Sequence, residues 1–308
     1  MMPVCRGCGA EHDRQFVRAE YVYGGKPEHN FWECKDCGLV YLYPLPSKDE
    51  EDYFYAKEFE KFMEFRAAGD RDWSGAEAHI KTNQDNVKRR WRFLEKHLKK
   101  GRSILEIGCS SGFMLDAFGE AGLHPTGIEP SGAFYEYLTN KGHTVFRSIE
   151  GLQATQKGRF DLIVHFFVLE HIRDTRAFIE TQLSLLKPGG LIIAEVPCVN
   201  DPLTSVYTIP AFERFYWSIA HHYYFNPRSL SCILDRIGCA YAFEPEQRYD
   251  ISNHITWLQA GKPGGQGKFN HIFSERTRTS YTNDLTSHWL CDTFFVYICR
   301  AGQEIVTV

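Results

Sequence analysis

The stretch SILEIGCSSGFML, residues 103–115, decides how the chain folds. Its first half has the apolar, branched composition of a β-strand, and its second half begins a helix. Between them, Gly108 and Gly112 allow a tight turn whose backbone N–H groups can face a bound ligand. Such a turn is a weak signal alone. It gains weight from Glu129, which follows a second predicted strand 21 residues beyond Gly108, where a carboxylate can accept hydrogen bonds from two ribose hydroxyls.

The same alternation of strand-like and helix-like segments continues to residue 197. Helices are expected to begin near Gly112, Ser131 and Asp174, the last one ending in a turn at Gly189 and Gly190. Alternation of this kind is the pattern of βαβ units, so we expect an α/β protein with a Rossmann-like, doubly wound sheet. The predicted strands are SILEIG (103–108), HPTGIE (124–129), HTVFR (143–147), FDLIVHFF (160–167), LIIAEVP (191–197) and, after a helix over 227–237, two more near 239–243 and over 292–299.

Four of the ten cysteines form two similar knuckles. Cys5 and Cys8 lie in CRGCG, Cys34 and Cys37 lie in CKDCG, and 25 residues separate the two pairs. Each knuckle offers two thiolates on a tight turn, and four thiolates at about 2.3 Å complete a closed tetrahedron around Zn²⁺. Because no ligand position stays open, we expect a structural zinc. The other cysteines lie on or beside apolar runs and are expected to be buried thiols.

Composition divides the chain into three parts. Residues 1–46 form the expected zinc ribbon, residues 47–100 a helical connector, and residues 101–308 the main domain, with an insert at about 247–290 that lacks clear periodicity. The basic segment 87–102 is expected to be an amphipathic helix with a solvated basic face. The connector also carries aromatic residues at irregular helical intervals, namely Tyr53, Phe54, Phe59, Phe62 and Phe65.

Bulk composition describes an ordinary globular chain. Hydrophobic residues make up 43% and charged residues 24% of the 308 residues, and the formal net charge is -4. A general nucleic-acid binder usually carries a basic surplus, so nucleic acid is not the expected partner. The chain shows neither a secretion signal at its start nor an apolar run of about 18 residues, which predicts a cytoplasmic location without a membrane span.

The glycine turn and three later motifs resemble class I S-adenosylmethionine-dependent methyltransferases. The first motif of that family reads roughly E/D-x-G-x-G-x-G; Glu106, Gly108 and Gly112 match it, and Ser110 replaces the middle glycine. The later matches are GIEPS (127–131), FDLIVHFFVLEHIRD (160–174) and LLKPGGLIIAEVP (185–197). The resemblance covers residues 100–300 and implies a mostly parallel, seven-stranded sheet with an antiparallel last strand.

The resemblance also implies S-adenosylmethionine as the cofactor, bound by the loop after the first strand. It places Glu129 on the ribose, and His165 and Phe166 near the methionine end of the cofactor. For Glu106, a role in cofactor binding and a structural role in holding the loop amides both stay open. The residues implied at the cofactor are Glu106, Gly108, Cys109, Ser110, Gly112, Phe113, Glu129, Pro130, His165 and Phe166.

A hydroxyl acceptor has to lose its proton, and histidine is the natural base near neutral pH. The candidates are Glu170 and His171, just beyond the fourth strand, and His221 in the segment AHHYYFNPRSL (220–230). This segment resembles the H-x-x-Y-F stretch of methyltransferases that act on sugars and sugar nucleotides, which makes His221 the first choice.

The sequence therefore predicts O-methylation of a sugar, sugar nucleotide or glycan, with a small molecule or glycan as the partner. Three alternatives stay open. A sugar C-methyltransferase also carries a zinc ribbon but has a further C-terminal domain; an RNA methyltransferase would use the ribbon to dock nucleic acid; a partner-binding protein would keep a vestigial methyltransferase core. Saturable binding of S-adenosylmethionine separates the enzymes from the last reading.

Overall fold

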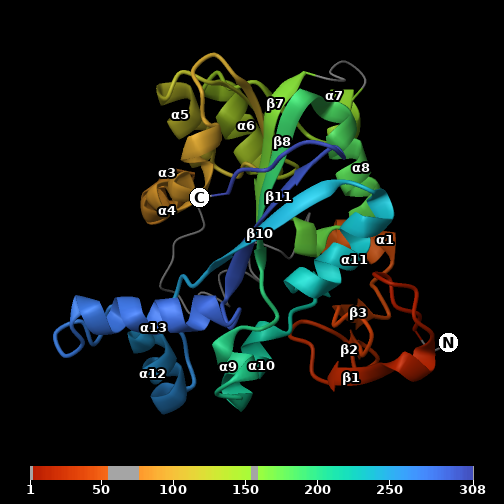
Figure 1. Cartoon of the computed structure of the whole chain (residues 1–308), viewed down its shortest axis with the longest axis vertical. Helices are drawn as coiled ribbons and strands as arrows, with labels where there is room; N and C mark the ends of the chain where they lie inside the picture. Colours follow the sequence, from red (N-terminus) through yellow and green to blue (C-terminus); the bar gives the residue numbers. More distant parts are fainter. Residues whose placement is uncertain (1–2, 55–75, 154–158, 308) are drawn as a thin grey trace.

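A computed structural model describes residues 3–54, 76–153 and 159–307. Its largest element is a seven-stranded sheet with the order β10-β11-β8-β7-β4-β5-β6 (Figure 1). Strands β4 to β8 pair in parallel, whereas β11 is antiparallel to both β8 and β10, so the expected sheet is confirmed. The bounds are β4 (Ser103–Ile107), β5 (His124–Ile128), β6 (Val145–Phe146), β7 (Phe160–Phe166), β8 (Leu186–Pro197), β10 (Ala240–Glu246) and β11 (Thr293–Cys299).

Strand β8 begins earlier than the sequence indicated. It starts directly after α8 (Thr175–Leu185), so Gly189 and Gly190 lie inside the strand instead of forming a turn before it. The pairing with β7 shifts register along this part of the strand, and Gly189 has a φ of +78°, which glycine tolerates. The two glycines therefore accommodate an irregularity in the ladder.

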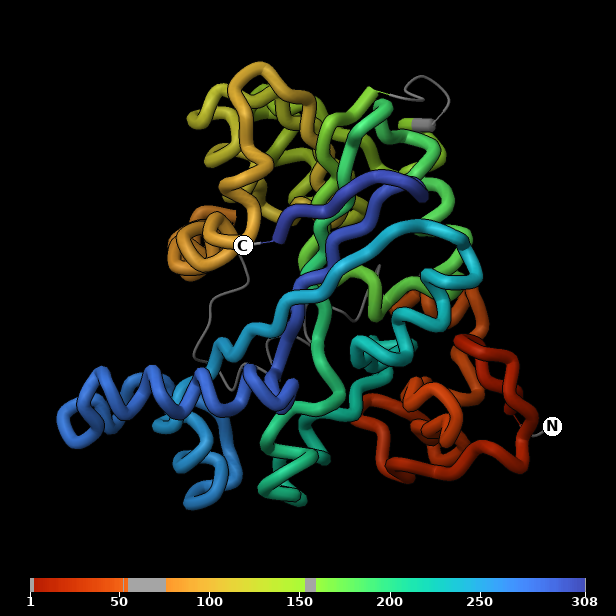
Figure 2. The backbone as a smooth tube through the Cα atoms, viewed as in Figure 1, coloured from red at the N-terminus to blue at the C-terminus, as the bar shows by residue number. Residues whose placement is uncertain are grey.

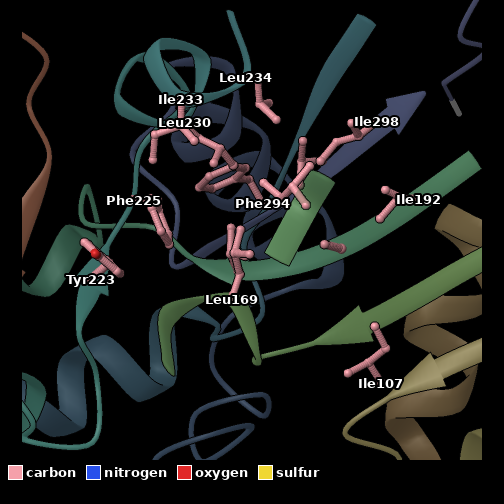
Figure 3. Packing of buried hydrophobic residues seen from close by; sticks show 14 of the residues in the cluster. Ile107, Leu169, Ile192, Tyr223, Phe225, Leu230, Ile233, Leu234, Phe294 and Ile298 are labelled. Atoms are coloured by element: carbon pink, nitrogen blue, oxygen red, sulfur yellow. The ribbon is translucent and has the colours of Figure 1, made fainter. Parts of the chain in front are cut away.

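Different helices cover the two faces of the sheet. One buried cluster joins β4, β7, β8 and β11 to α8 and α11 (Pro227–Ile237), as Figure 3 shows around Leu169, Leu230 and Phe294. A second cluster joins the opposite face to α4 (Gln84–Leu94) and α5 (Phe113–Glu120). Leu138 of α6 (Gly132–Asn140) packs on the loop after β4, and α7 is Ile149–Gln153. This two-sided cover explains why FDLIVHFF is almost continuously apolar.

The N-terminal segment forms a separate four-stranded sheet with the order β1-β2-β3-β9. Three of its strands belong to the ribbon: β1 (Gln15–Ala19), β2 (Asn30–Cys34) and β3 (Val40–Tyr43). The fourth, β9 (Tyr223–Tyr224), comes from the second half of the chain, and Figure 2 shows the ribbon lying beside that part of the fold. Sequence periodicity cannot reveal a pair separated by about 180 residues.

The aperiodic segment after β10 contains two helices, α12 (Ile251–Ala260) and α13 (Glu275–Ser287). Helix α13 projects sideways from the sheet in Figure 1. The buried positions of α12 are polar except for Trp257, and they include Asn253, His254 and Thr256, so the helix has no apolar stripe that a sequence pattern would show. Two short helices, α9 (Pro202–Ser205) and α10 (Pro210–Tyr216), lie between β8 and β9.

The connector is helical where the structure describes it, as α1 (Lys48–Tyr53), α3 (Ala76–Thr82) and α4. Phe59, Phe62 and Phe65 lie outside the described residues. Helix α4 corrects the expectation of a wholly solvated basic face, because Arg90 is only 6% exposed and its Nε donates to Glu195 at 3.0 Å. Among the described helices, none has the length and apolar character needed to cross a membrane.

His165, on β7, gives the fold a pH-dependent stability. Its ring is 1% exposed, and burial lowers its pKa from 6.5 to about 3. The unfolded chain therefore binds a proton that the folded chain does not bind as the pH falls below 6.5, and stability falls with it. From pH 7.5 to pH 5, we expect this one group to cost about 2 kcal/mol.

In urea titrations, His165→Phe should therefore lose about 2 kcal/mol less than the wild-type protein between these two pH values. His288→Phe, at an exposed position, serves as the control and should follow the wild-type protein. Identical losses in all three proteins would show that His165 is protonated in the folded state.

Candidate functional site

The loop after β4 is held in a shape that glycine makes possible. Gly108 and Gly112 have φ values of +73° and +80°. The backbone N–H groups of Gly108 and Cys109 both donate to the carbonyl of Ile128, which ties the loop to the end of β5. A Cβ on Gly112 would lie 2.4 Å from Leu138, so the loop and α6 approach too closely for a side chain. Both glycines are therefore required by the backbone geometry.

Ser110 takes the place of the middle glycine and adopts a left-handed conformation, with a φ of +52°. That region costs a residue with a Cβ about 1–2 kcal/mol. We expect Ser110→Gly to raise the free energy of unfolding by about 0.5–1 kcal/mol, since the relief of strain exceeds the extra backbone entropy of glycine.

The measurement is a urea titration of the wild-type protein and two variants. Ser131→Gly is the matched control, because the φ of Ser131 is -64° and glycine there relieves nothing. A loss of stability in Ser110→Gly equal to that in the control would contradict the assignment of strain.

Glu129 closes this loop from the end of β5. One carboxylate oxygen accepts from the N–H of Ser110 at 2.6 Å and the other from the N–H of Ser131 at 2.8 Å. Burial raises the pKa of Glu129, and the two backbone hydrogen bonds oppose the shift. Pro130 follows at an exposed position. The side chain expected on a ribose thus also orders the loop that would receive the cofactor.

A second buried carboxylate, Glu106, lies on β4 beside the loop. Its Oε2 has no hydrogen-bond partner within residues 3–54, 76–153 and 159–307, and burial raises its pKa well above the usual range. Arg90 opposes that shift and Glu129 adds to it. An unpaired buried carboxylate is costly unless a ligand group pairs with it.

Four other expected cofactor residues, Cys109, Phe113, His165 and Phe166, lie in different surroundings. Cys109 is buried and packs with Leu115 and Leu138. Phe113 begins α5, and the guanidinium of Arg90 lies 4.1 Å from the ring centre of Phe166 and 5.6 Å from that of Phe113. His165 faces the opposite side of the sheet, where its ring meets Phe178 of α8.

Two residues near the loop were missed by the sequence reasoning. His79 of α3 is buried, its Nδ1 lies 2.8 Å from Oγ of Ser111, and its ring contacts Phe113. Arg90 was assigned to a solvated face. A histidine within a polar connector carries no motif, so no signal in the sequence indicated His79. The pair Arg89–Arg90 lies next to the apolar positions of its helix, and it indicates a buried ion pair, since Arg is rarely buried without a partner.

The segment after β7 touches the loop directly. A Cβ on Gly108 would meet the side chain of Val168 at 2.8 Å. Phe167, the first residue past the strand, has a φ of +58°, an uncommon conformation for a bulky residue and one that clusters at functional sites. Leu169–His171 then form a 3₁₀ turn. Glu170 and His171 therefore stand close to the loop that follows β4.

The three candidates for acid–base chemistry lie together. The ligand-type side-chain atoms of Glu170, His171 and His221 are all within 4.8 Å of one another. The rings of His171 and His221 meet edge to face with centres 4.8 Å apart, and Nε2 of His171 lies 3.9 Å from Glu170. The structure thus brings together side chains that are about 50 residues apart in the sequence.

A hydrogen bond fixes the tautomer of His171, and burial sets the protonation state of Glu170. Nδ1 of His171 lies 2.6 Å from the carbonyl oxygen of Ala220, so Nδ1 carries the proton and Nε2 of the neutral ring offers a lone pair. Burial raises the pKa of Glu170 to about 8, and its two carboxylate oxygens have no hydrogen-bond partner in the described part of the chain. Near neutral pH, Glu170 is therefore mostly protonated and can itself donate.

The four ribbon cysteines also converge. Sγ of Cys5 lies 3.5 Å from Sγ of Cys37, and Sγ of Cys8 lies 3.6 Å from Sγ of Cys34. Four sulfurs at about 2.3 Å from one Zn²⁺ would be about 3.8 Å apart, so the spacing fits the ion closely. Gly9 and Gly38, which end the knuckles, have φ values of +81° and +73°. Their N–H groups donate to the carbonyls of Cys5 and Cys34.

The parallel sheet, the glycine loop and the carboxylate after β5 together define a Rossmann-like nucleotide-binding enzyme. A family model described as "Methyltransferase domain" matches residues 77–242, more than half of the chain. The chain belongs to this family of methyltransferase domains.

Curated relatives match shorter stretches. A ubiquinone biosynthesis O-methyltransferase of Methylococcus capsulatus is 30% identical over 128 residues, which are 39% of this chain and 54% of the relative. A tRNA U34 carboxymethyltransferase of Alteromonas mediterranea is 29% identical over 185 residues, 54% of this chain and 52% of the relative. The chain thus spans about half the length of these relatives.

Among solved structures, a SAM-dependent methyltransferase from Archaeoglobus fulgidus aligns with a TM-score of 0.49 and 19% identity. The alignment covers 70% of this chain and 93% of that one.

Proposed function

We propose that this methyltransferase transfers the methyl group to a hydroxyl oxygen of a small, uncharged acceptor, with His221 as the base. The observation that carries the proposal is the group Glu170, His171 and His221, assembled beside the loop that follows β4. Side chains that can take up a proton are of use where the acceptor has to lose one. Relatives named as O-methyltransferases support transfer to oxygen.

The residues around the glycine loop fit S-adenosylmethionine. The cofactor supplies a methyl group on a positively charged sulfur, and its methionine end carries an ammonium and a carboxylate. The unpaired Oε2 of Glu106 suits the ammonium group, and the buried guanidinium of Arg90, which already pairs with Glu195, suits the carboxylate. Glu129, already hydrogen-bonded to the loop, retains lone pairs for the ribose hydroxyls.

On the acceptor side, His221 takes the proton and its neighbours set its geometry. The ring of His221 is packed between those of His171 and Tyr224, with centres 4.8 Å and 5.0 Å away. Because the proton of His171 stays on Nδ1, toward Ala220, its Nε2 can accept a hydrogen bond inside the group. Alignment of acceptor and methyl group can supply several kcal/mol of the barrier, so this ordering matters as much as basicity.

The cavity beside the histidine group favours an uncharged acceptor. A cavity of about 180 Å³ lies next to Ala220 and His222 and is lined by the side chains of Lys26, Glu50 and Glu51 among others. Its charges are paired, Lys26 with Glu50 and Glu51 with Arg173, each at 2.5 Å. Balanced charges favour an uncharged acceptor over a polyanion.

We retain a sugar or glycan hydroxyl as the first acceptor class, on the strength of the segment AHHYYFNPRSL. The relatives carry other names, for ubiquinone biosynthesis and for tRNA. Phenols and RNA are therefore the two classes against which the sugar has to be tested.

The test is incubation of the protein with methyl-labelled S-adenosylmethionine and a panel of nucleotide sugars, neutral oligosaccharides, catechol-type phenols and RNA. We expect label in an alkali-stable ether of a sugar. Ether formation only on phenols would keep oxygen transfer and overturn the sugar assignment. Label confined to RNA would overturn the proposal.

We also propose a structural Zn²⁺ held by Cys5, Cys8, Cys34 and Cys37. The near-tetrahedral spacing of the four sulfurs supports it, as does the side-chain amide of Gln15, which donates to Sγ of Cys34 at 3.6 Å. Metal analysis of the purified protein should give about one zinc per chain.

A further inference from the structure

The strand that follows the second cysteine knuckle is bonded to the segment that carries His221. Strand β3 begins three residues after Cys37, and Val40 and Tyr41 pair with Tyr224 and Tyr223. The next N–H along β3, that of Leu42, donates to the carbonyl of His222 at 2.9 Å. The three residues after His221 are thus all held by the ribbon.

The same short segment is held from its other side by the turn after β7. The N–H of His222 donates to the carbonyl of Glu170 at 2.7 Å, and the carbonyl of Ala220 accepts the Nδ1 proton of His171 at 2.6 Å. Residues 220–222 therefore lie between β3 and the Glu170–His171 turn. A displacement of β3 would move His221 and His171 together.

Direct contacts connect the cysteine cluster to this strand. Gln15 donates to Sγ of Cys34 and accepts from the hydroxyl of Tyr41 at 3.1 Å. The carbonyl of Gly38, inside the knuckle turn, accepts from the side chain of Asn226 at 3.2 Å. The sulfurs are thus linked through one side chain to β3, and through one turn to the residue that caps α11.

The ribbon sheet is also buried on both faces. Leu39 and Tyr41 belong to the cluster that contains Cys5, Cys34 and Cys37. The same cluster includes Tyr223, Phe225 and residues of α11, which Figure 3 shows. Val40 and Leu42, which alternate with them, pack with Trp217 and with residues of α9 and α10. The position of β3 therefore cannot change without repacking the surroundings of His221.

We propose that the metal-bound ribbon positions His221 and His171 for the acceptor, so that the four cysteines control methyl transfer without contributing to cofactor binding. The proposal rests on the proposed function of the histidine group. The glycine loop belongs to β4 and β5, and the contacts that shape it come from Glu129, Ile128 and His79, all outside the ribbon. Loss of the metal should therefore separate the two halves of the active site.

The experiment compares the full-length protein with Cys37→Ser and with Cys239→Ser. The second variant is the control, because Cys239 is a half-buried cysteine outside the ribbon. Zinc content, the dissociation constant of S-adenosylmethionine, hydrogen exchange of peptides over 103–115 and 218–226, and C2-proton exchange of the histidines are measured for each. Wild-type protein treated with a chelator, and then given zinc back, covers the case in which Cys37→Ser fails to fold.

Loss of zinc should speed exchange over 218–226 by about tenfold or more, while 103–115 is unchanged and cofactor affinity stays within about twofold. Loss of zinc should also shift the pH midpoint of C2-proton exchange at His221 and His171, and added zinc should restore the original midpoint. Unchanged exchange over 218–226 in zinc-free protein would overturn the proposal. Equal loss of protection over 103–115, with loss of cofactor binding, would also overturn it, because the ribbon would then be a general stability element.

These readouts require no acceptor, so they distinguish the two proposals. A protein that fails to methylate any hydroxyl, yet shows zinc-dependent protection of 218–226, would contradict the proposed function and leave the coupling intact. Once an acceptor is found, zinc loss should lower kcat and leave the KM for S-adenosylmethionine unchanged.

Discussion

Replacing His221 with alanine is expected to lower methyl-transfer turnover by about 10²–10⁴-fold, the usual contribution of a positioned base. The dissociation constant of S-adenosylmethionine should stay the same, since the hydrogen bonds that shape the loop after β4 come from Glu129, Ile128 and His79. Turnover falls because the acceptor hydroxyl would then have to lose its proton to water instead of to His221. Steady-state kinetics on the acceptor found in the panel, together with calorimetry of the cofactor, measures both quantities.

His288→Ala is the matched control for this experiment, because that histidine is exposed at the end of α13. It should keep wild-type turnover. Normal turnover in His221→Ala would move the base to His171 or Glu170, and variants of these residues would then be compared in the same assay.

Replacing Glu129 with alanine is expected to weaken cofactor binding by about 10- to 100-fold, the loss of one charge-assisted hydrogen-bonding group. Two effects combine. The ribose loses its acceptor, and the N–H groups of Ser110 and Ser131 lose the carboxylate that orders the loop. Calorimetry with S-adenosylmethionine measures the change, and a urea titration checks that the variant remains folded.

Glu150→Ala, on the exposed surface of α7, is the control and should bind the cofactor as the wild-type protein does. An unchanged affinity in Glu129→Ala would remove this carboxylate from the ribose. It would leave Glu129 the purely local role of holding the loop.

The sheet could be predicted from the sequence because its signals are local. Each parallel strand is a short apolar run, each helix between strands has its own start signal, and the order of the motifs fixes the order of the strands. The C-x-x-C-G knuckles are local in the same sense, and their four sulfurs do meet. The boundaries of the strands were predicted less accurately: β8 begins at Leu186, whereas the sequence predicted a strand over 191–197.

The long-range pairings could not be predicted in this way. No periodicity links Tyr41 to Tyr223, or Arg90 to Glu195, because each pair joins segments more than 100 residues apart. From the sequence, Glu170, His171 and His221 were expected only to lie at the same edge of the sheet, and their direct contacts were not predicted. Helix α12 was missed because its buried positions are polar except for Trp257, and α13 was missed because Leu285 is its one buried residue.

The central claim, a methyltransferase whose cofactor site is built on the loop 108–112, is tested most directly by titrating the full-length protein with S-adenosylmethionine in a calorimeter. The account predicts saturable binding of about one cofactor per chain, weakened in Glu129→Ala and unchanged in His221→Ala. Absence of saturable binding to folded, zinc-loaded protein would contradict it.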